Sequence, residues 1–487
     1  MEGKKETRQW ARNNALKNAK IKKPKPKFNL MSDESNHQVA TDFSGKLAKP
    51  PWGYRQWMLA GNPAIFFDHL VNRFGDFVHY RGAFNFYLIN HPDLIKTVLQ
   101  QTNKRFDKNT PIYRRFANAF GNGLVVSEDN QWRCQRKLMQ PMFGHRAIEQ
   151  FFPVMIESTN EMLARWQARP NQDSSFDIAP EMSRLTLEIV GRTLFRDNFG
   201  SVSDRIREWT HTIDTYSAKP PIPIVRDFWF PSGRNRRLKR TLREFHGFIQ
   251  KMIDERLTTK QKDDLLGILL RSQDPESGQA MSRPQIADEV LGMIVGGHET
   301  SSSALTWAWY ELAQHPETLT KVLEEIDQVI GSGPLEIEKI KELSFTRMVL
   351  DEVLRLHPPF WFENRNTRQK TKLAGVDLPI GSIIVMSRYS LHRHSEYWLD
   401  PDQFNPNRFR PKHEENSRSS YAYIPFGGGP RICIGTHFAM MEMLVIMALI
   451  GRRYKIELSC EDRHKMSAAT TMTPKYGVRV IAHPRAS

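Results

Sequence analysis

The run from Pro284 to about His315 constrains the fold more than any other segment, because it predicts a long helix that is apolar on nearly all its faces. Pro284 suits a first helical position, Ser282 suits the cap before it, and Pro316 closes the segment. A helix that is apolar all round is buried inside a large protein. Its middle nevertheless reads GGHET over residues 296–300, and two poor helix formers beside a carboxylate mark a functional site.

The remaining pattern is mainly helical with a few short β elements. Residues 77–88 alternate around Gly82 as a hairpin does, and residues 373–387 predict a second small β element. The Pro- and Asn-rich stretch 400–411 has no clear periodicity, and no internal repeat is present, so we expect one domain over residues 50–487. Helices are predicted over residues 149–167, 176–195, 237–256, 316–330, 346–357 and 436–453.

Positive charge is concentrated at the N-terminus. The chain carries a net charge of +16 from 70 basic and 54 acidic residues, and Met1–Lys27 alone holds ten basic and two acidic residues. Such an arm can attract nucleic acid or an acidic membrane, but it lacks the apolar stretch of a secretory signal. We expect residues 1–49 to be a disordered arm, with weak attraction to a membrane or partner as the alternative. Without a run of 18 or more apolar residues, no transmembrane anchor is expected.

Cysteine usage narrows the chemistry further. Only Cys134, Cys433 and Cys460 occur, which is no disulfide framework and indicates a reducing compartment. Three thiols are also too few for a cysteine-only zinc or iron–sulfur site. Any thiol chemistry must therefore depend on a single residue.

Cys433 stands in the segment FGGGPRICIG, residues 426–435. Glycines flank it directly before a helix, so backbone amides can approach its sulfur without side-chain clash. The donors and dipole of a helix N-terminus stabilise a thiolate, which is the form that binds a metal. Arg431 supplies a cation nearby. For one cysteine alone, the ordinary alternative is a structural residue in a glycine-rich turn.

The full pattern F-x-x-G-x-R-x-C-x-G decides between these alternatives. It is carried by Phe426, Gly429, Arg431, Cys433 and Gly435, and by chance it would occur in fewer than about one in ten thousand chains of this length. It resembles the haem-binding loop of the cytochrome P450 family at every fixed position. The resemblance implies haem b as the cofactor, Cys433 as the axial ligand of its iron, and Arg431 beside a haem propionate.

The segment GGHETS, residues 296–301, is similar to the oxygen-activation segment of the same family. The resemblance implies a helix distorted at Gly296-Gly297, a Thr300 hydroxyl that holds a water or a proton, and Glu299 as the general acid that resupplies protons. The alternative is a buried helix whose glycines serve packing and whose threonine hydrogen-bonds its own backbone. His298 is not expected to be a ligand.

Two further matches concern the haem propionates. WRCQR, residues 132–136, resembles the family's W-x-x-x-R, whose spacing puts Trp132 and Arg136 on one helix face as donors. A surface arginine beside a half-buried tryptophan is the alternative. Arg365 fits a further propionate arginine, with Arg368 as a near competitor and His392 as a weaker candidate.

EVLR, residues 352–355, looks like the family's E-x-x-R, in which an acid and a base share one helix face. In the family this pair joins an arginine of a downstream meander, which Arg408 resembles. We expect Glu352, Arg355 and Arg408 to have a structural role on the cysteine side. Positions that match the walls of the family's substrate pocket are Val125, Val295, Gly296 and Phe360, although an aromatic run around Phe360 also suits a plain core.

The resemblance covers roughly residues 50–484. It implies a mainly α-helical fold with small β-sheets, a single triangular-prism catalytic domain that holds haem between the long helix and the Cys433 loop. It also implies a monooxygenase, in which molecular oxygen, two electrons and two protons insert one oxygen atom into a substrate. The apolar positions of the expected pocket suit an apolar substrate, such as a fatty acid, a terpenoid or a polyketide-like molecule. The expected reaction on it is hydroxylation or epoxidation.

Electrons are expected to come ultimately from NAD(P)H through a separate ferredoxin, flavodoxin or flavin reductase, and the chain resembles soluble bacterial members of the family. We expect a cytoplasmic monomer that binds no nucleic acid. Two alternatives are a peroxide-driven peroxygenase, against which Glu299 and Thr300 argue, and a haem-thiolate protein that binds a ligand without turnover.

Overall fold

The computed structural model describes residues 46–170, 173–200, 202–218, 232–258, 264–273, 278, 280–411, 418–459 and 465–485. Nearly all of the expected basic arm, and Cys460, lie outside these residues. Within them, no helix combines the length and the apolar character that crossing a membrane requires. The described ranges all belong to one unit, Asp42–Ser487, which carries every predicted site residue.

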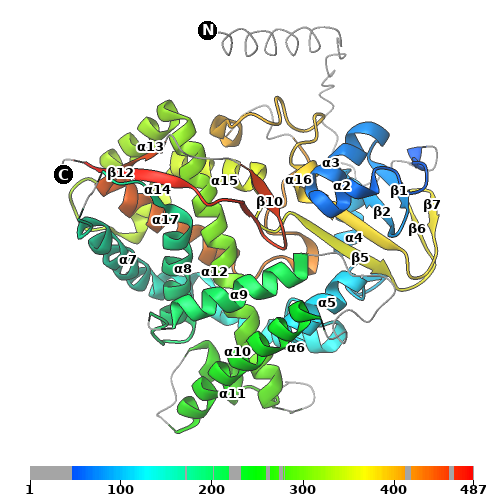
Figure 1. Cartoon of the computed structure of the whole chain (residues 1–487), viewed down its shortest axis with the longest axis horizontal. Coiled ribbons are helices and arrows are strands. Elements are labelled where there is room, and N and C mark those ends of the chain that lie inside the picture. Colours follow the sequence, from blue (N-terminus) through cyan, green and yellow to red (C-terminus); the bar gives the residue numbers. More distant parts are fainter. Residues whose placement is uncertain are drawn as a thin grey trace. The chain divides into compact units, whose positions relative to one another are not determined.

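Helices form most of this unit (Figure 1). The helices of the described residues are α2 (Gln56–Gly61), α3 (Pro63–Phe74), α4 (Pro92–Gln100), α5 (Pro111–Phe120), α6 (Asp129–Met139), α7 (His145–Gln167), α8 (Ile178–Leu194), α9 (Ser203–Ala218), α10 (Gly233–Thr258), α11 (Leu265–Arg271), α12 (Arg283–Gln314), α13 (Pro316–Val329), α14 (Ile337–Glu342), α15 (Ser344–Leu356), α16 (Arg388–Leu391) and α17 (Thr436–Arg453), with short 3-10 turns η2 (Gln140–Phe143), η3 (Pro406–Phe409), η5 (Ser420–Ala422) and η6 (Gly429–Arg431).

The strands form small sheets at the edges of the helical body. Their bounds are β1 (Phe77–Arg81), β2 (Asn85–Ile89), β3 (Phe106–Asp107), β4 (Phe176–Asp177), β5 (Phe362–Thr367), β6 (Thr371–Leu373), β7 (Val376–Leu378), β8 (Ile383–Ser387), β9 (Tyr454–Leu458), β10 (Met466–Ala468), β11 (Met472–Pro474) and β12 (Arg479–Pro484). The largest sheet has the order β1-β2-β8-β5-β3, and the others are β4-β12-β9, β6-β7 and β10-β11. The mainly helical fold with small sheets that we expected is confirmed.

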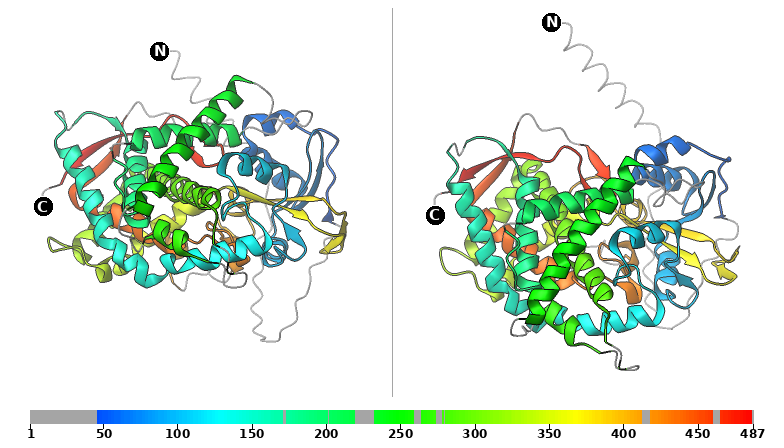
Figure 2. Two further views of the ribbon diagram at one scale, coloured as in Figure 1. Left: turned by 90° about the horizontal axis from the view of Figure 1, so that it is seen from below. Right: turned by 60° about the horizontal axis from the view of Figure 1, so that its bottom comes forward.

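The long buried helix is confirmed as α12. The Ser282 side chain accepts from the Gln285 amide, and the Gln285 side chain accepts from the Ser282 amide, so the two close a capping box at its start. In the left view of Figure 2 α12 is seen nearly end-on, with other helices around it. It packs against α8, α10, α15 and α17. Helices on several sides bury its apolar faces, which is why the sequence shows no polar face.

The five-stranded sheet lies at one end of the unit, drawn in blue and yellow in Figure 1. β1 pairs antiparallel with β2, which confirms the predicted hairpin around Gly82. β8 then joins β2 in parallel, so residues 383–387 reach the sheet from far along the chain. The sheet packs on α3 and α4 through two hydrophobic clusters separate from the main core around α12.

The predicted helices are present with small shifts at their ends. The helix predicted from residue 176 begins at Ile178, because the Asp177 side chain accepts from the Ala179 amide while residues 176–177 pair with β12. The last helix has the predicted bounds, Thr436–Arg453. The patterns did not predict α9 or the β10–β11 hairpin.

Candidate functional site

The loop that carries Cys433 is fixed by close backbone approaches. Gly429 has a φ of 65°, and a Cβ there would lie 2.4 Å from the carbonyl oxygen of Leu99 in α4. Only glycine tolerates both constraints without strain. The Cys433 amide donates to the Phe426 carbonyl at 2.9 Å, which closes the turn just before α17. Phe426 itself packs against the main core.

The surroundings of the Cys433 sulfur combine burial with donors. Burial raises the pKa of the thiol, whereas the Gly435 amide, the Arg136 guanidinium and the Thr436 hydroxyl act to lower it. Although protein atoms crowd around it, the side chain is still solvent-accessible. Gly435 is the N-cap of α17, so the sulfur lies at the start of that helix. Burial is the largest of these influences, so the pKa of the thiol is raised, while the nearby donors are groups that would stabilise a metal-bound thiolate.

Arg431 lies in a polar cluster beside this loop. Its guanidinium stacks over the Trp132 ring at 4.1 Å and donates to the Ser127 carbonyl at 2.7 Å. It also forms an ion pair with Glu128 at 3.2 Å. Its Nε is buried without a hydrogen-bond partner among the described residues. Burial lowers the pKa of Arg431 to about 10, so a cation is held here at a cost in desolvation.

Arg365 extends the cluster from β5. Its Nη2 contacts Glu363 at 2.8 Å, and its Nε donates to the Thr102 hydroxyl at 3.2 Å. Glu363 also pairs with Arg388. Burial would raise the pKa of Glu363, but Arg388 and Arg365 hold it below the usual value. Arg368, the competitor considered for the role of Arg365, instead pairs with Asp129 at 2.7 Å toward solvent.

Lys108 is a member of this cluster that the sequence patterns missed. Its Nζ donates to the Val125 carbonyl at 2.8 Å, and burial together with Arg365 and Arg431 lowers its pKa well below the usual value. No motif contains Lys108, because only the fold brings residue 108 to residues 365 and 431.

Arg136 and Trp132 lie on one face of α6, yet they have different partners. Arg136 donates to the Ile432 carbonyl at 2.8 Å, directly before Cys433, while Trp132 is buried under Arg431. Arg136 is half-buried and Trp132 is buried, whereas the alternative interpretation was a surface arginine beside a half-buried tryptophan.

The middle of α12 keeps its helical hydrogen bonding through Gly296-Gly297, so the expected distortion is not a break in the helix. Gly297 allows Val190 of α8 to approach, since a Cβ there would lie 3.0 Å from that side chain. The Thr300 hydroxyl donates to the Gly296 carbonyl at 2.9 Å. Burial, and secondarily Asp214, raise the pKa of Glu299 well above its usual value, which favours the protonated form of its carboxyl.

His298 is buried, and its Nδ1 lies 2.7 Å from the Ile294 carbonyl. Burial lowers its pKa to about 4, which makes it a neutral core residue.

The expected pocket residues differ in exposure. Val125 is 42% exposed and Gly296 is exposed, whereas Val295 is buried and Phe360 is half-buried. The Phe360 carbonyl accepts from Arg388 at 2.7 Å, which ties that segment to the cation cluster.

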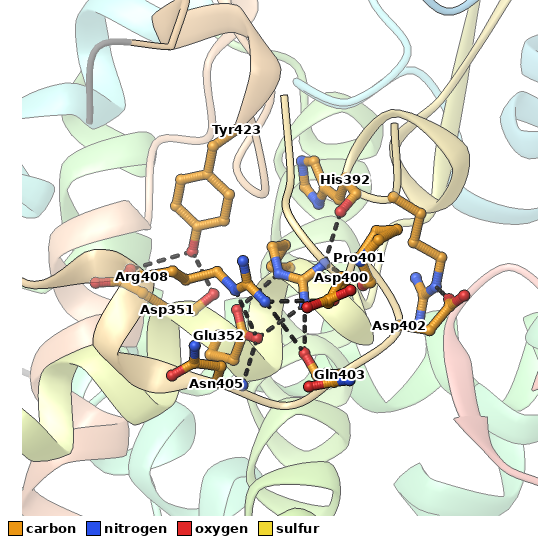
Figure 3. A network of polar contacts seen from close by, with 12 residues as sticks. Asp351, Glu352, His392, Asp400, Pro401, Asp402, Gln403, Asn405, Arg408 and Tyr423 are labelled. Atoms are coloured by element: carbon orange, nitrogen blue, oxygen red, sulfur yellow. Dashed lines mark hydrogen bonds and ion pairs between the residues drawn. The ribbon is translucent and has the colours of Figure 1, made fainter. Parts of the chain in front are cut away.

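Glu352, Arg355 and Arg408 form a fully buried network (Figure 3). Arg355 donates to both Glu352 carboxylate oxygens, at 2.6 and 2.8 Å, and Arg408 donates to Oε1 at 3.1 Å. Arg355 also donates to the His392 carbonyl at 2.8 Å. His392 Nε2 in turn accepts from the Ile424 amide at 3.0 Å. This chain of contacts connects α15 to the start of the Cys433 loop.

Comparisons with known proteins agree with this arrangement. A family model described as Cytochrome P450 matches residues 44–481. The chain is 34% identical to cyclooctatin synthase of Streptomyces melanosporofaciens, covering 88% of this chain and 93% of the relative. It is 32% identical to pentalenene oxygenase of Streptomyces avermitilis, over 86% and 92% of the two chains. It is also 32% identical to cyclooctat-9-en-7-ol 5-monooxygenase of Streptomyces melanosporofaciens, over 78% and 83%.

The chain belongs to the cytochrome P450 family and is a monooxygenase of that family. The residues present fit the haem that the family implies. The buried arginines Arg365, Arg388 and Arg431 lie close together beside Glu128 and Glu363, with Asp129 also near Arg431. Arg431 Nε has no hydrogen-bond partner among the described residues. A buried donor of this kind requires an acceptor, which a haem propionate would supply.

Proposed function

We propose that this enzyme oxidises a terpenoid, with electrons that come ultimately from NAD(P)H through a separate ferredoxin, flavodoxin or flavin reductase. The single observation that carries the substrate class is the agreement of three relatives. Cyclooctatin synthase, pentalenene oxygenase and cyclooctat-9-en-7-ol 5-monooxygenase all match over more than three quarters of this chain, and the last two are named for terpenoid substrates. Hydroxylation or epoxidation is the expected outcome.

Cys433 is the residue that we propose as the axial ligand. The accessible sulfur at the start of α17, with the Gly435 amide and Arg136 beside it, supports this assignment. Arg431, Arg365, Trp132 and Arg136 are proposed to hold the propionate side. Haem held by these residues would supply the activation of molecular oxygen.

On the opposite side, Glu299 and Thr300 are proposed to manage protons. The raised pKa of the Glu299 carboxyl favours its protonated form, and Thr300 lies one residue further along α12. Breaking its hydrogen bond to the Gly296 carbonyl frees the Thr300 hydroxyl to orient a water. Apolar walls at Val295 and Phe360 are proposed to keep other water away from the substrate.

The test is the absorption spectrum of the purified, dithionite-reduced protein under carbon monoxide. A strongly red-shifted Soret band is expected for the wild type, and the Cys433→His variant should retain some haem while it loses that band. A band typical of histidine ligation in the wild type would refute the assignment of Cys433. Substrate-dependent consumption of oxygen and reductant then separates a monooxygenase from a peroxide-driven enzyme and from a protein that only binds a ligand.

A further inference from the structure

The loop of residues 121–128, which connects α5 to α6, contacts α12 through the amides of its first half. The Asn122 amide donates to Asp288 Oδ2 at 2.8 Å, and the Leu124 amide donates to Glu289 Oε2 at 3.0 Å. Asp288 and Glu289 are neighbours on α12, so two adjacent acids hold the first half of the loop.

The carbonyls of the second half of this loop face cations instead. The Val125 carbonyl accepts from Lys108 Nζ at 2.8 Å, and the Ser127 carbonyl accepts from Arg431 Nη1 at 2.7 Å. Glu128, the last residue of the loop, forms an ion pair with Arg431 at 3.2 Å. The second half of the loop is therefore tied to the arginine that we assign to the propionate side.

Internal hydrogen bonds join the two halves into one turn. The Gly123 carbonyl accepts from the amides of Val126 and Ser127, both at 2.9 Å. Gln135 of α6 spans the same turn, since its Nε2 donates to the Asn122 carbonyl at 3.1 Å and its Oε1 accepts from the Ser127 hydroxyl. Because the turn is connected in this way, a shift of its first half moves the Ser127 carbonyl as well.

Glu289 is an acid in the interior of the protein. Its side chain is buried, and its Oε1 has no hydrogen-bond partner among the described residues. Burial raises the pKa of Glu289 to about 8, with a smaller rise from Asp288, while the Leu124 amide acts to lower it. Burying a carboxyl in this way is costly for the fold, and the contact with the loop is what the carboxyl provides here.

We propose that Glu289 is a positioning residue that, through this loop, fixes the Arg431 guanidinium for a haem propionate. The proposal rests on the proposed place of Arg431 beside a propionate and is independent of the substrate class. The Ser127 carbonyl and Glu128 hold the two Nη atoms of Arg431, which leaves its buried and unpaired Nε for the propionate. Without the hydrogen bond from the Leu124 amide to Glu289, the turn shifts and Arg431 loses this alignment.

The experiment measures the rate at which the haem-loaded full chain loses haem to an excess of apomyoglobin. Glu289→Leu should speed haem loss about tenfold, the factor expected for one weakened hydrogen bond to a charged group. Glu289→Gln keeps an acceptor for the Leu124 amide, so it should lose haem at the wild-type rate. The matched control is Glu208→Leu, the same substitution at an exposed acid of α9, which should also leave the rate unchanged.

Two further arms show whether Glu289 acts through Arg431. In an Arg431→Gln background, Glu289→Leu should speed haem loss little further, because residues that act through one another give non-additive effects. The same result is expected when wild type and Glu289→Leu are loaded with haem dimethyl ester, whose esterified propionates offer no anion to Arg431. A merely structural role of Glu289 would give the same factor in every arm, and that result would overturn the inference.

The remaining outcomes separate this inference from the proposed function. Equal rates of haem loss in wild type and Glu289→Leu overturn the inference alone. If Arg431→Gln by itself leaves the rate unchanged, the proposed place of Arg431 beside a propionate is refuted, and the inference with it. The carbon monoxide spectrum shows whether each variant folds. If Glu289→Leu does not fold, Gly123→Ala replaces it, because the added Cβ would lie 3.0 Å from the Asp288 carbonyl oxygen and displace the same turn.

Discussion

Replacing Glu352 by glutamine tests the buried network on the cysteine side. Glu352 and Arg355 are 0% exposed and Arg408 is 1% exposed, so no solvent compensates for a lost charge. Glu352 Oε1 accepts from Arg355, Arg408 and the Asn405 amide, and Oε2 accepts from Arg355. Glutamine keeps one acceptor oxygen but turns N–H donors toward two guanidinium groups.

The expected loss follows from this geometry. Removing one partner of a buried ion pair costs about 3–5 kcal/mol, because the remaining charge stays buried without compensation. Against a typical unfolding free energy of about 5–15 kcal/mol this is a large fraction. Since 1.36 kcal/mol corresponds to a factor of ten, hydrogen-exchange protection of residues 399–408 should fall by about two to four powers of ten.

The assay is amide hydrogen exchange of the haem-loaded protein, because a protein with a bound cofactor need not unfold in two states. The control is Glu324→Gln, which changes an exposed acid of α13 and should alter stability by no more than about 0.5 kcal/mol. Faster exchange in Glu352→Gln should reach Ile424 through the His392 contact and weaken the thiolate spectrum. Protection equal to that of the control would show that the network does not stabilise this side.

Three further predictions concern single side chains. Thr300→Ala should raise the amount of peroxide released per reductant consumed. The control Thr306→Ala removes an equivalent hydrogen bond, to the Ser302 carbonyl on the same helix, and should not raise it. If both variants released as much peroxide as the wild type, the proton role of Thr300 would be refuted. Burial raises the pKa of Glu442 to about 8, above the usual 4.5 of the unfolded chain. The Glu442 carboxyl therefore keeps its proton in the native state at pH values where unfolding releases it. The contribution of this protonated carboxyl to the free energy of unfolding is complete below about pH 4.5. Between about pH 4.5 and pH 8 that free energy declines by at most about 1.4 kcal/mol per pH unit. Glu442→Gln should flatten that decline in urea unfolding, and an unchanged pH profile would contradict the assignment. Gly429→Ala should lower haem content and thermal stability, because the added Cβ would lie 2.4 Å from the Leu99 carbonyl oxygen. The control is Gly292→Ala on α12, where no atom lies within 4 Å of the added Cβ. It should leave thermal stability unchanged or raise it.

Local patterns predicted the parts of the fold whose causes are local. α12 was predictable because Ser282 and Pro284 begin it and apolar residues cover its faces, and the structure shows the same cap. The Cys433 loop was predictable because its glycines allow the backbone to come close to groups a few residues away or to one neighbouring helix, α4. Such features depend on spacing, and spacing can be read from a sequence.

Long-range partners could not be predicted in this way. Lys108 meets Arg365 and Arg431 only after folding, and residue 108 lies in no periodic segment. The β10–β11 hairpin is short, and it is held by Trp361, Ser303 and Trp307 from two other regions. α9 mixes charged and apolar residues, so its pattern gave no clear boundary. Contacts of this kind connect residues far apart in the sequence, so no local motif contains them.

The Glu352 network and the Arg431 side chain differ in whether all of their buried polar atoms form hydrogen bonds. Each carboxylate oxygen of Glu352 has donors from the protein, so its network is complete and holds the fold. Arg431 Nε, by contrast, is buried without a hydrogen-bond partner among the described residues. An unpaired buried donor destabilises a protein, and a bound anion would relieve that cost. Because the family resemblance places Arg431 beside a haem propionate, binding of haem should stabilise this side of the protein more in the wild type than in a variant that lacks the arginine.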